Sequence, residues 1–226
     1  MDTAPPPRGT ARGAPGLRIT EIFLSLQGET RAVGWPSVFV RLTGCPLRCR
    51  YCDTAYAFRG GRWMAIDPIL DAVAAYRPRH VTVTGGEPLA QRDCLALLGR
   101  LCDAGYEVFL ETGGALSVEA VDPRVVRVLD LKTPGSGECR RNRYENLAVL
   151  GPRDQVKFVC CDRRDYEWAR EQVERCGLTG RCEVLFSPSH GVLAPGLLAD
   201  WILEDRLAVR LQIQLHKYLW GDVPGR

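Results

Sequence analysis

The chain has 226 residues, which is enough for one large domain with a substantial buried core. Its 30 basic and 27 acidic residues give a formal net charge of +3, so the charge balance does not indicate a nucleic-acid partner or an acidic membrane surface. Long apolar runs are absent, and the segment 1–16, rich in Pro, Gly and Ala, lacks the apolar stretch of a secretory signal. We therefore expect a cytoplasmic protein with no nucleic-acid or membrane partner, in which a disordered tail at 1–16 precedes a single domain at 17–226.

Apolar, β-rich runs alternate with helical patterns along the rest of the chain. Strands are expected at 18–29, 37–44, 80–86, 106–114, 125–132, 155–161, 182–188 and 209–216. Helices are expected between them, at 67–76, 89–105, 163–177 and 194–205. This alternation predicts βαβ units and a parallel sheet. Because about six βα units are too few to close an eight-stranded barrel, we expect an α/β fold that forms a partial, open TIM-like barrel.

Several of the expected strands end in residues that can carry chemistry. Active sites of α/β sheets and barrels form at the carboxyl ends of their strands, so these ends are expected to meet in one place. They are Gly85-Gly86-Glu87, Glu111-Thr112-Gly113-Gly114, Asp130-Leu131-Lys132 and Ser187-Pro188.

Three of the ten cysteines lie together in the segment TGCPLRCRYCDT, at Cys45, Cys49 and Cys52. A disulfide is rare in a reducing compartment and would leave an odd thiol. A structural zinc site normally has four ligands, and no fourth Cys or His lies nearby. A 4Fe–4S cluster held by three thiolates has one iron that a small molecule can chelate. The spacing favours such a cluster, with a zinc site or structural thiols as the alternatives.

The spacing C-x3-C-x2-C, with Tyr51 directly before the last cysteine, resembles the signature of the radical S-adenosylmethionine (SAM) superfamily. The segment TVTGGEP at 82–88 is similar to the Gly-Gly-Glu-Pro motif of that superfamily. Glycine suits this position, since a residue without Cβ lets the backbone approach the amino end of SAM closely. The resemblance implies a 4Fe–4S cluster on the three cysteines and SAM as the second cofactor.

Further segments resemble the 7-carboxy-7-deazaguanine synthase family, over about residues 19–220. The matching segments are FLSLQGET (23–30), FVRLTGCPLRCRYCDT (39–54), ETGG (111–114), DLKTPGSGE (130–138), KFV (157–159) and LQIQLHKYLW (211–220). The resemblance implies a lyase that converts 6-carboxy-5,6,7,8-tetrahydropterin into 7-carboxy-7-deazaguanine with loss of ammonia, on the route to queuosine and tRNA modification. It also implies a requirement for Mg²⁺, a homodimer, and an electron donor such as flavodoxin or ferredoxin.

The same resemblance implies roles for individual residues. The expected substrate-binding residues are Leu26, Gln27, Gly28, Glu29, Arg41, Thr84 and His216. The expected SAM contacts are Tyr51, Gly86, Glu111, Asp130, Leu131, Lys132, Ser187, Pro188, Ser189 and His190. Thr54 is the expected magnesium ligand, since Mg²⁺ binds oxygen ligands and bridges them to substrate oxygens.

Some of these roles have alternatives. Arg41 lies in an apolar strand and needs a partner, which is either the substrate carboxylate or an internal salt bridge. His216, expected on the last strand, is either a substrate contact or a core histidine. Glu111 suits either the ribose hydroxyls or the methionine ammonium of SAM.

Two other functions share part of the pattern. An activase that installs a glycyl radical on a protein would also have the cysteine loop and the Gly-Gly-Glu-Pro motif, although the seven remaining cysteines lack the spacing of further clusters. A zinc-stabilised binding module would need only the cysteines.

Overall fold

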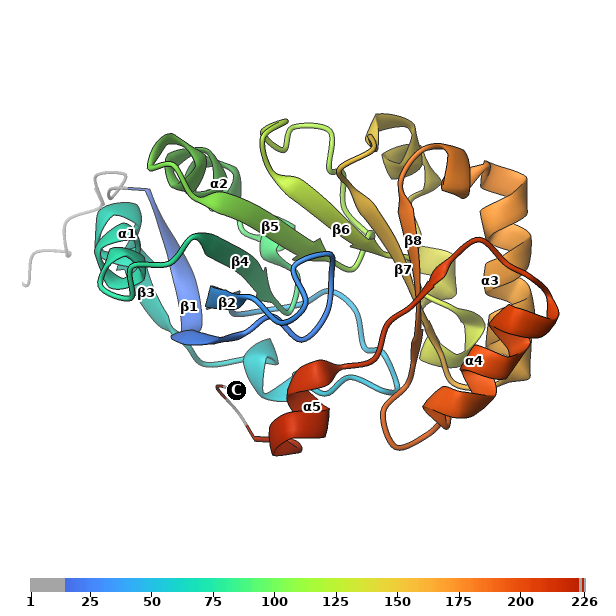
Figure 1. The fold of residues 1–226 in the computed structure, drawn as a ribbon. Coiled ribbons are helices and arrows are strands. Elements are labelled where there is room, and N and C mark those ends of the chain that lie inside the picture. Colours follow the sequence, from blue (N-terminus) through green and yellow to red (C-terminus); the bar gives the residue numbers. More distant parts are fainter. Residues whose placement is uncertain (1–14, 224, 226) are drawn as a thin grey trace, which may run out of the picture.

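The computed structural model describes residues 15–223 and residue 225 of the chain (Figure 1). The expected disordered tail therefore lies almost wholly outside the described residues. Its last residue, Gly16, begins the first strand and pairs with Ala65.

One mixed sheet organises the described part of the chain, and its strands run in the order β3-β1-β2-β4-β5-β6-β7-β8-β9. The strands are β1 (Gly16–Leu26), β2 (Pro36–Leu42), β3 (Arg62–Ala65), β4 (His80–Gly85), β5 (Glu107–Thr112), β6 (Val126–Asp130), β7 (Gln155–Cys160), β8 (Glu183–Pro188) and β9 (Arg210–Leu211). From β2 to β9 every neighbouring pair is parallel, whereas β1 pairs antiparallel with β2 and β3. The edge strands β3 and β9 do not pair with each other, so the predicted partial, open barrel is confirmed.

The helices are α1 (Ile66–Ala74), α2 (Cys94–Asp103), α3 (Arg163–Cys176), α4 (Pro195–Glu204) and α5 (Leu215–Trp220). The first four follow the expected helical patterns and contribute apolar side chains to the largest core cluster. In Figure 1 they flank the sheet, while α5 lies apart from them at the bottom centre. Within the described residues, none of the helices is long and apolar enough to cross a membrane.

The end of the chain departs from the expected strand at 209–216. The strand β9 contains only Arg210 and Leu211, and α5 begins at Leu215. The alternation of apolar residues in LQIQL is typical of a strand. In the structure, however, the side-chain amide of Gln212 donates to the backbone oxygen of the next residue, Ile213, at 2.8 Å. His216 is therefore a helical residue, and the prediction that it lies on a strand is wrong.

The expected helix at 89–105 is also shorter than predicted. It begins at Cys94, because Pro88–Ala90 form a separate 3-10 turn. The side-chain amide of Gln91 then donates to the backbone oxygens of Arg18 and Thr43, both at 2.9 Å. These bonds tie the start of α2 to β1 and to the chain entering the cysteine segment.

A buried ion pair joins the amino ends of β6 and β7. Asp154 accepts hydrogen bonds from the backbone N–H of Arg127 at 2.8 Å and from its Nη1 at 3.2 Å. The same carboxylate accepts a bond from the N–H of Gly151 at 2.8 Å. With side chains only 10% and 6% exposed, each charge depends on the other for compensation.

We expect Asp154→Ala to lower the free energy of unfolding by about 3 kcal/mol, because it leaves the Arg127 guanidinium buried without its partner. Glu167→Gln is the matched control, since it breaks the exposed pair with Arg163 and should cost less than about 1 kcal/mol. Urea unfolding followed by circular dichroism measures both. Equal losses in the two variants would contradict a structural role for the buried pair.

Candidate active site

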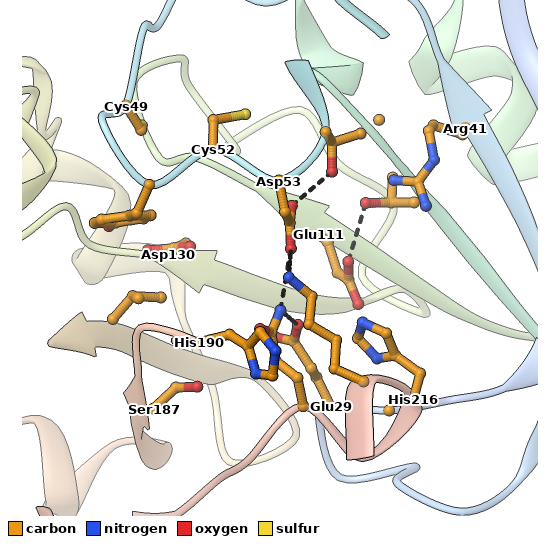
Figure 2. Close-up of a pocket in the computed structure, with 18 of the residues that line it drawn as sticks. Glu29, Arg41, Cys49, Cys52, Asp53, Glu111, Asp130, Ser187, His190 and His216 are labelled. Carbon is orange, nitrogen blue, oxygen red and sulfur yellow. Dashed lines mark hydrogen bonds and ion pairs between the residues drawn. The ribbon is translucent and has the colours of Figure 1, made fainter. Parts of the chain in front are cut away.

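A cavity of about 300 Å³ lies where the carboxyl ends of the parallel strands meet. All the predicted site residues except Leu131 border it. The side chain of Leu131 is fully buried in the hydrophobic core, and its contact with SAM stays a prediction. Figure 2 shows side chains from the cysteine loop, the strand ends and α5 facing one another across the cavity.

The cysteine loop is held by backbone bonds from its neighbours. The N–H of Arg48 donates to Glu138 at 2.7 Å, and the N–H of Arg50 donates to the Ser136 oxygen at 3.0 Å. The thiols of Cys45, Cys49 and Cys52 border the cavity, although within the described chain they are not drawn together into a preformed metal site. Burial raises the pKa of all three and brings that of Cys49 to about 11, so a metal must displace their protons to bind.

The segment after β4 packs backbone against backbone on this loop. A Cβ on Gly86 would lie 2.2 Å from the Gly44 carbonyl oxygen, and the N–H of Glu87 donates to the same oxygen at 2.8 Å. The buried Glu87 carboxylate also accepts bonds from the Thr112 hydroxyl and from the N–H of Gly113, both at 2.8 Å. This glutamate therefore ties the ends of β4 and β5 to the cysteine loop.

A second group of polar side chains comes from β1, the turn after it, β4 and β5. The amide of Gln27 donates to Glu111 at 3.3 Å and accepts a bond from the N–H of Glu29 at 3.0 Å. The hydroxyl of Thr84 donates to the other oxygen of Glu111 at 2.9 Å. Glu111, whose contact with SAM stays a prediction, lies among the residues expected to bind the substrate. Burial, reinforced by the charge of Glu29, raises the pKa of Glu111.

Arg41 has the internal partner that was one of its two expected roles. Its Nε lies 2.7 Å from the Glu21 carboxylate, and the hydroxyl of Tyr56 donates to the same oxygen at 2.8 Å. The guanidinium lies over the rings of Phe23 and Tyr56, at 5.8 and 5.9 Å from their centroids. Arg41 also borders the cavity, so the ion pair orients it there rather than removing it from the site.

The helix α5 closes one side of the cavity against the turn after β1. The N–H of Leu215 donates to the Gly28 oxygen at 2.9 Å, and a Cβ on Gly28 would lie 2.0 Å from Nδ1 of His216. Glycine is therefore required at position 28 for the histidine to lie where it does. Burial lowers the pKa of His216, which keeps the imidazole neutral at pH 7.

Asp53 links the cysteine loop to α5. It pairs with Lys217 at 2.9 Å and accepts a bond from the Gln214 amide at 3.3 Å. Burial acts to raise the pKa of Asp53, but the bond and charge of Lys217 outweigh it and hold that pKa well below its usual range. The hydroxyl of Thr54 donates to Asp53 at 2.8 Å, which leaves the lone pairs of that hydroxyl free to bind a cation.

The far side of the cavity carries the residues expected to contact SAM. Lys132 pairs with Asp130 at 2.9 Å, and its ammonium lies 5.9 Å from the centroid of the Tyr51 ring. Within the described residues, the Tyr51 hydroxyl and one oxygen of Asp130 are buried without a hydrogen-bond partner. Buried polar atoms of this kind normally have a partner, so a polar ligand at this position would satisfy them.

Comparison with known proteins places the chain in a family. Residues 39–177 match the Radical SAM superfamily. The chain is 49% identical over 208 residues to the 7-carboxy-7-deazaguanine synthase of Chlorobaculum tepidum, covering 91% of this chain and 94% of the relative. It is 45% identical over 219 residues to that of Koribacter versatilis, covering 90% and 97%. The chain belongs to the 7-carboxy-7-deazaguanine synthase family of the radical SAM superfamily.

Solved structures share the fold. The crystal structure of QueE from Escherichia coli superposes with a TM-score of 0.73 at 24% identity, over 89% of this chain and 95% of that one. Streptococcus suis SuiB bound to a precursor peptide superposes with a TM-score of 0.56 at 16% identity, over 76% of this chain and 46% of that one. The fold is therefore shared by proteins of quite different length.

The cofactors of radical SAM enzymes are a 4Fe–4S cluster and SAM, and the residues present fit both. Three thiols border one cavity, which is the donor set that a 4Fe–4S cluster with one open iron requires. The glycine pair after β4 brings backbone next to the cysteine loop without side chains between them. The buried Tyr51 hydroxyl and Asp130 oxygen supply polar partners at the far end.

Several residues that border the cavity were not predicted from the motifs. They are Phe23, Asp53, Tyr56, Lys157, Gln214 and Lys217. One signal for two of them is present in the sequence: the chain contains only three lysines, and all three border the cavity.

We expect Gly86→Ala to raise the dissociation constant for SAM by about tenfold or more, because the added Cβ would overlap the Gly44 carbonyl and displace the cysteine loop. Gly196→Ala in α4 is the control, since its Cβ would meet no atom within 4 Å and should leave SAM binding unchanged. Equilibrium binding of SAM to the two anaerobically reconstituted variants measures this. Unchanged affinity in Gly86→Ala would contradict the close approach.

Proposed function

We propose that the chain is a carbon–nitrogen lyase that converts 6-carboxy-5,6,7,8-tetrahydropterin into 7-carboxy-7-deazaguanine with release of ammonia. This reaction would supply queuosine and other 7-deazapurines for tRNA modification. The observation that carries the proposal is the polar group formed by Gln27, Glu29, Thr84 and Glu111, which faces the cysteine loop across one cavity. The family membership of the chain supports the same reaction.

The chemistry of these side chains suits a pterin. The aminopyrimidinone edge of a pterin carries both N–H donors and oxygen and nitrogen acceptors, and a carboxylate beside an amide can satisfy both kinds. Glu29 and Gln27 are held in fixed orientations by Gln214 and Thr82, at 3.0 Å in both cases. The stacked rings of Phe23 and Phe39, 5.1 Å apart, border the same cavity and would exclude water from a flat ring system.

Two groups are available for the substrate carboxylate. Arg41 is a permanent cation at the edge of the cavity, and its pair with Glu21 fixes the direction of its guanidinium. The neutral His216 can donate one N–H from the side of α5. When bound, the cluster and SAM supply hydrogen-atom abstraction through the 5′-deoxyadenosyl radical, while the protein binds, orients and shields the pterin.

We also propose that Mg²⁺ binds at Thr54. The hydroxyl proton of Thr54 is engaged with Asp53, so the oxygen presents lone pairs toward the cavity, and Mg²⁺ prefers oxygen ligands shared with substrate oxygens.

We propose in addition a single domain at 17–226, a homodimer in the cytoplasm, and flavodoxin or ferredoxin as the electron donor.

The glycyl-radical activase reading has no specific support. An activase must admit a polypeptide segment, whereas the cavity has a volume of about 300 Å³ and is lined by side chains that hydrogen-bond one another. That volume is at the lower end of small-molecule sites.

The proposed reaction is tested with protein purified without oxygen and reconstituted with iron and sulfide. With SAM, a reductant, Mg²⁺ and carboxytetrahydropterin, we expect 7-carboxy-7-deazaguanine and ammonia in equal amounts. Cys49→Ala should lose the cluster absorbance and the product, because it removes one of three iron ligands. Cys176→Ala, at the end of α3 outside the cavity, should keep both. A protein that cleaves SAM but leaves the pterin unchanged would refute the substrate and keep the superfamily.

The magnesium proposal predicts a separate effect. Thr54→Val should weaken the binding of Mg²⁺, because the oxygen ligand is lost. The Mg²⁺ concentration that gives the half-maximal rate should rise by about tenfold or more. Thr54→Ser, which keeps the hydroxyl, should retain most of the wild-type response. Turnover measured across a Mg²⁺ titration after chelator treatment gives the comparison, and identical curves for Val and Ser would exclude Thr54 as a ligand.

A further inference from the structure

The three lysines of the chain all lie at the cavity. The sequence contains 27 arginines but only Lys132, Lys157 and Lys217 as lysines, and each of the three borders the cavity. Arginine therefore supplies the basic side chains everywhere else in the molecule. A lysine ammonium is a compact charge that can press against a single carboxylate oxygen, whereas a guanidinium is planar and larger. The cavity thus uses lysine where a compact cation is needed.

Each lysine has its own carboxylate. Lys132 pairs with Asp130 at 2.9 Å, on the side expected to hold SAM. Lys217 pairs with Asp53 at 2.9 Å, beside the cysteine loop. Lys157, on β7, lies 2.5 Å from Glu29, in the polar group proposed to bind the pterin. The first two pairs lie near the cofactors, and Lys157 has no role in the proposals above.

Both oxygens of the Glu29 carboxylate are fixed. Lys157 donates to Oε2, and the Gln214 amide donates to Oε1 at 3.0 Å. The side chains of Glu29 and Lys157 are only 14% and 13% exposed, so the pair is largely desolvated. The ammonium also lies 3.7 Å from Asp130, which is farther than its contact with Glu29. The geometry therefore directs the lysine mainly at Glu29.

Three ionisable groups from different elements face Glu29: Lys157 on β7, His216 on α5 and Glu111 on β5, while Asp130 on β6 faces the ammonium of Lys157. Burial acts to raise the pKa of Glu29, but the charge and hydrogen bond of Lys157 outweigh it and lower that pKa. Glu111, by contrast, accepts its bonds from neutral groups, and burial raises its pKa. The pKa values of two neighbouring carboxyl groups are thereby moved in opposite directions.

We propose that Lys157 is a positioning residue, which holds Glu29 as an ionised, oriented acceptor for the N–H groups of the bound pterin. This inference rests on the proposed function. Without the lysine, Glu29 would be a buried carboxyl beside Glu111, and it would take up a proton near neutral pH. A protonated Glu29 would present a donor where the pterin presents donors, and the ring would lose that contact.

The test uses the reconstituted enzyme with SAM bound and measures binding of 6-carboxypterin, a stable oxidised analogue, by quenching of its fluorescence. In Lys157→Met the dissociation constant should rise by about tenfold or more at about pH 5.5, where Glu29 of the variant is protonated. It should return toward the wild-type value as the pH rises to about 7.5, a range over which the wild-type affinity stays flat. Lys157→Arg, which keeps the charge, should restore part of the affinity.

A double-substitution cycle separates positioning from a general structural role. If Lys157 acts through Glu29, Lys157→Met should add little further loss when Glu29→Gln is already present. The double variant also lacks the unpaired buried charge, so it should fold even where Lys157→Met alone is unstable. Arg170→Met is the control, since Arg170 and its partner Asp205 do not border the cavity and the pterin affinity should stay unchanged.

The outcomes are distinct. If the wild-type enzyme binds no carboxypterin and leaves the tetrahydropterin unchanged, the proposed function and this inference both fail. If the wild type binds it but Lys157→Met binds equally well with the same pH profile, the inference alone is refuted. Additive losses in the cycle, or a loss of SAM affinity in place of pterin affinity, would likewise overturn it.

Discussion

The contact on which the site depends is the approach of two backbones that have no side chain between them. Gly86, after β4, comes so near the Gly44 carbonyl that a single added carbon would overlap it. Glu87 follows and bonds the same carbonyl, and its carboxylate holds the end of β5. The cysteine loop therefore rests directly on the sheet, and its thiols face the cavity at the carboxyl ends of the strands. Every other group of the site takes its position relative to this contact.

Charged side chains line the cavity, and they are stabilised there because each is paired with a group of opposite charge or with hydrogen-bond donors. Taking a carboxylate or ammonium out of water is costly, and an unpaired buried charge costs several kcal/mol. Three carboxylates here are each matched by one lysine, and Glu111 is accommodated with neutral donors. The Asp53 pair, with the bond from Gln214, also joins the cysteine loop to α5 (Figure 2). Charge pairing thereby sets the shape of the cavity as well as its chemistry.

The sequence predicted the open barrel and the positions of most cavity residues, because chemistry-bearing residues follow strand patterns that meet at one edge. It failed at the end of the chain, where LQIQL alternates like a strand but the segment leaves the sheet after Leu211. The bond from Gln27 to Glu111 was not predicted, because strand order alone does not say which neighbour a side chain reaches, and Gln27 lies in the turn after β1. Lys157 and Lys217 were not predicted as site residues, because the periodicity of apolar and polar residues does not reveal ion pairs between residues far apart in the sequence.

The distribution of lysines has a practical consequence for chemistry done on the protein. Every side-chain amine of the chain belongs to a lysine that is 9–13% exposed and lies at the cavity. Reagents that acylate amines will therefore find almost no reactive group on the outer surface, and the side-chain amines they do reach will be those of the cavity. Amine-directed cross-linkers will therefore detect few of the contacts that this protein makes with other molecules. Reagents directed at carboxylates or arginines will be needed to map these contacts.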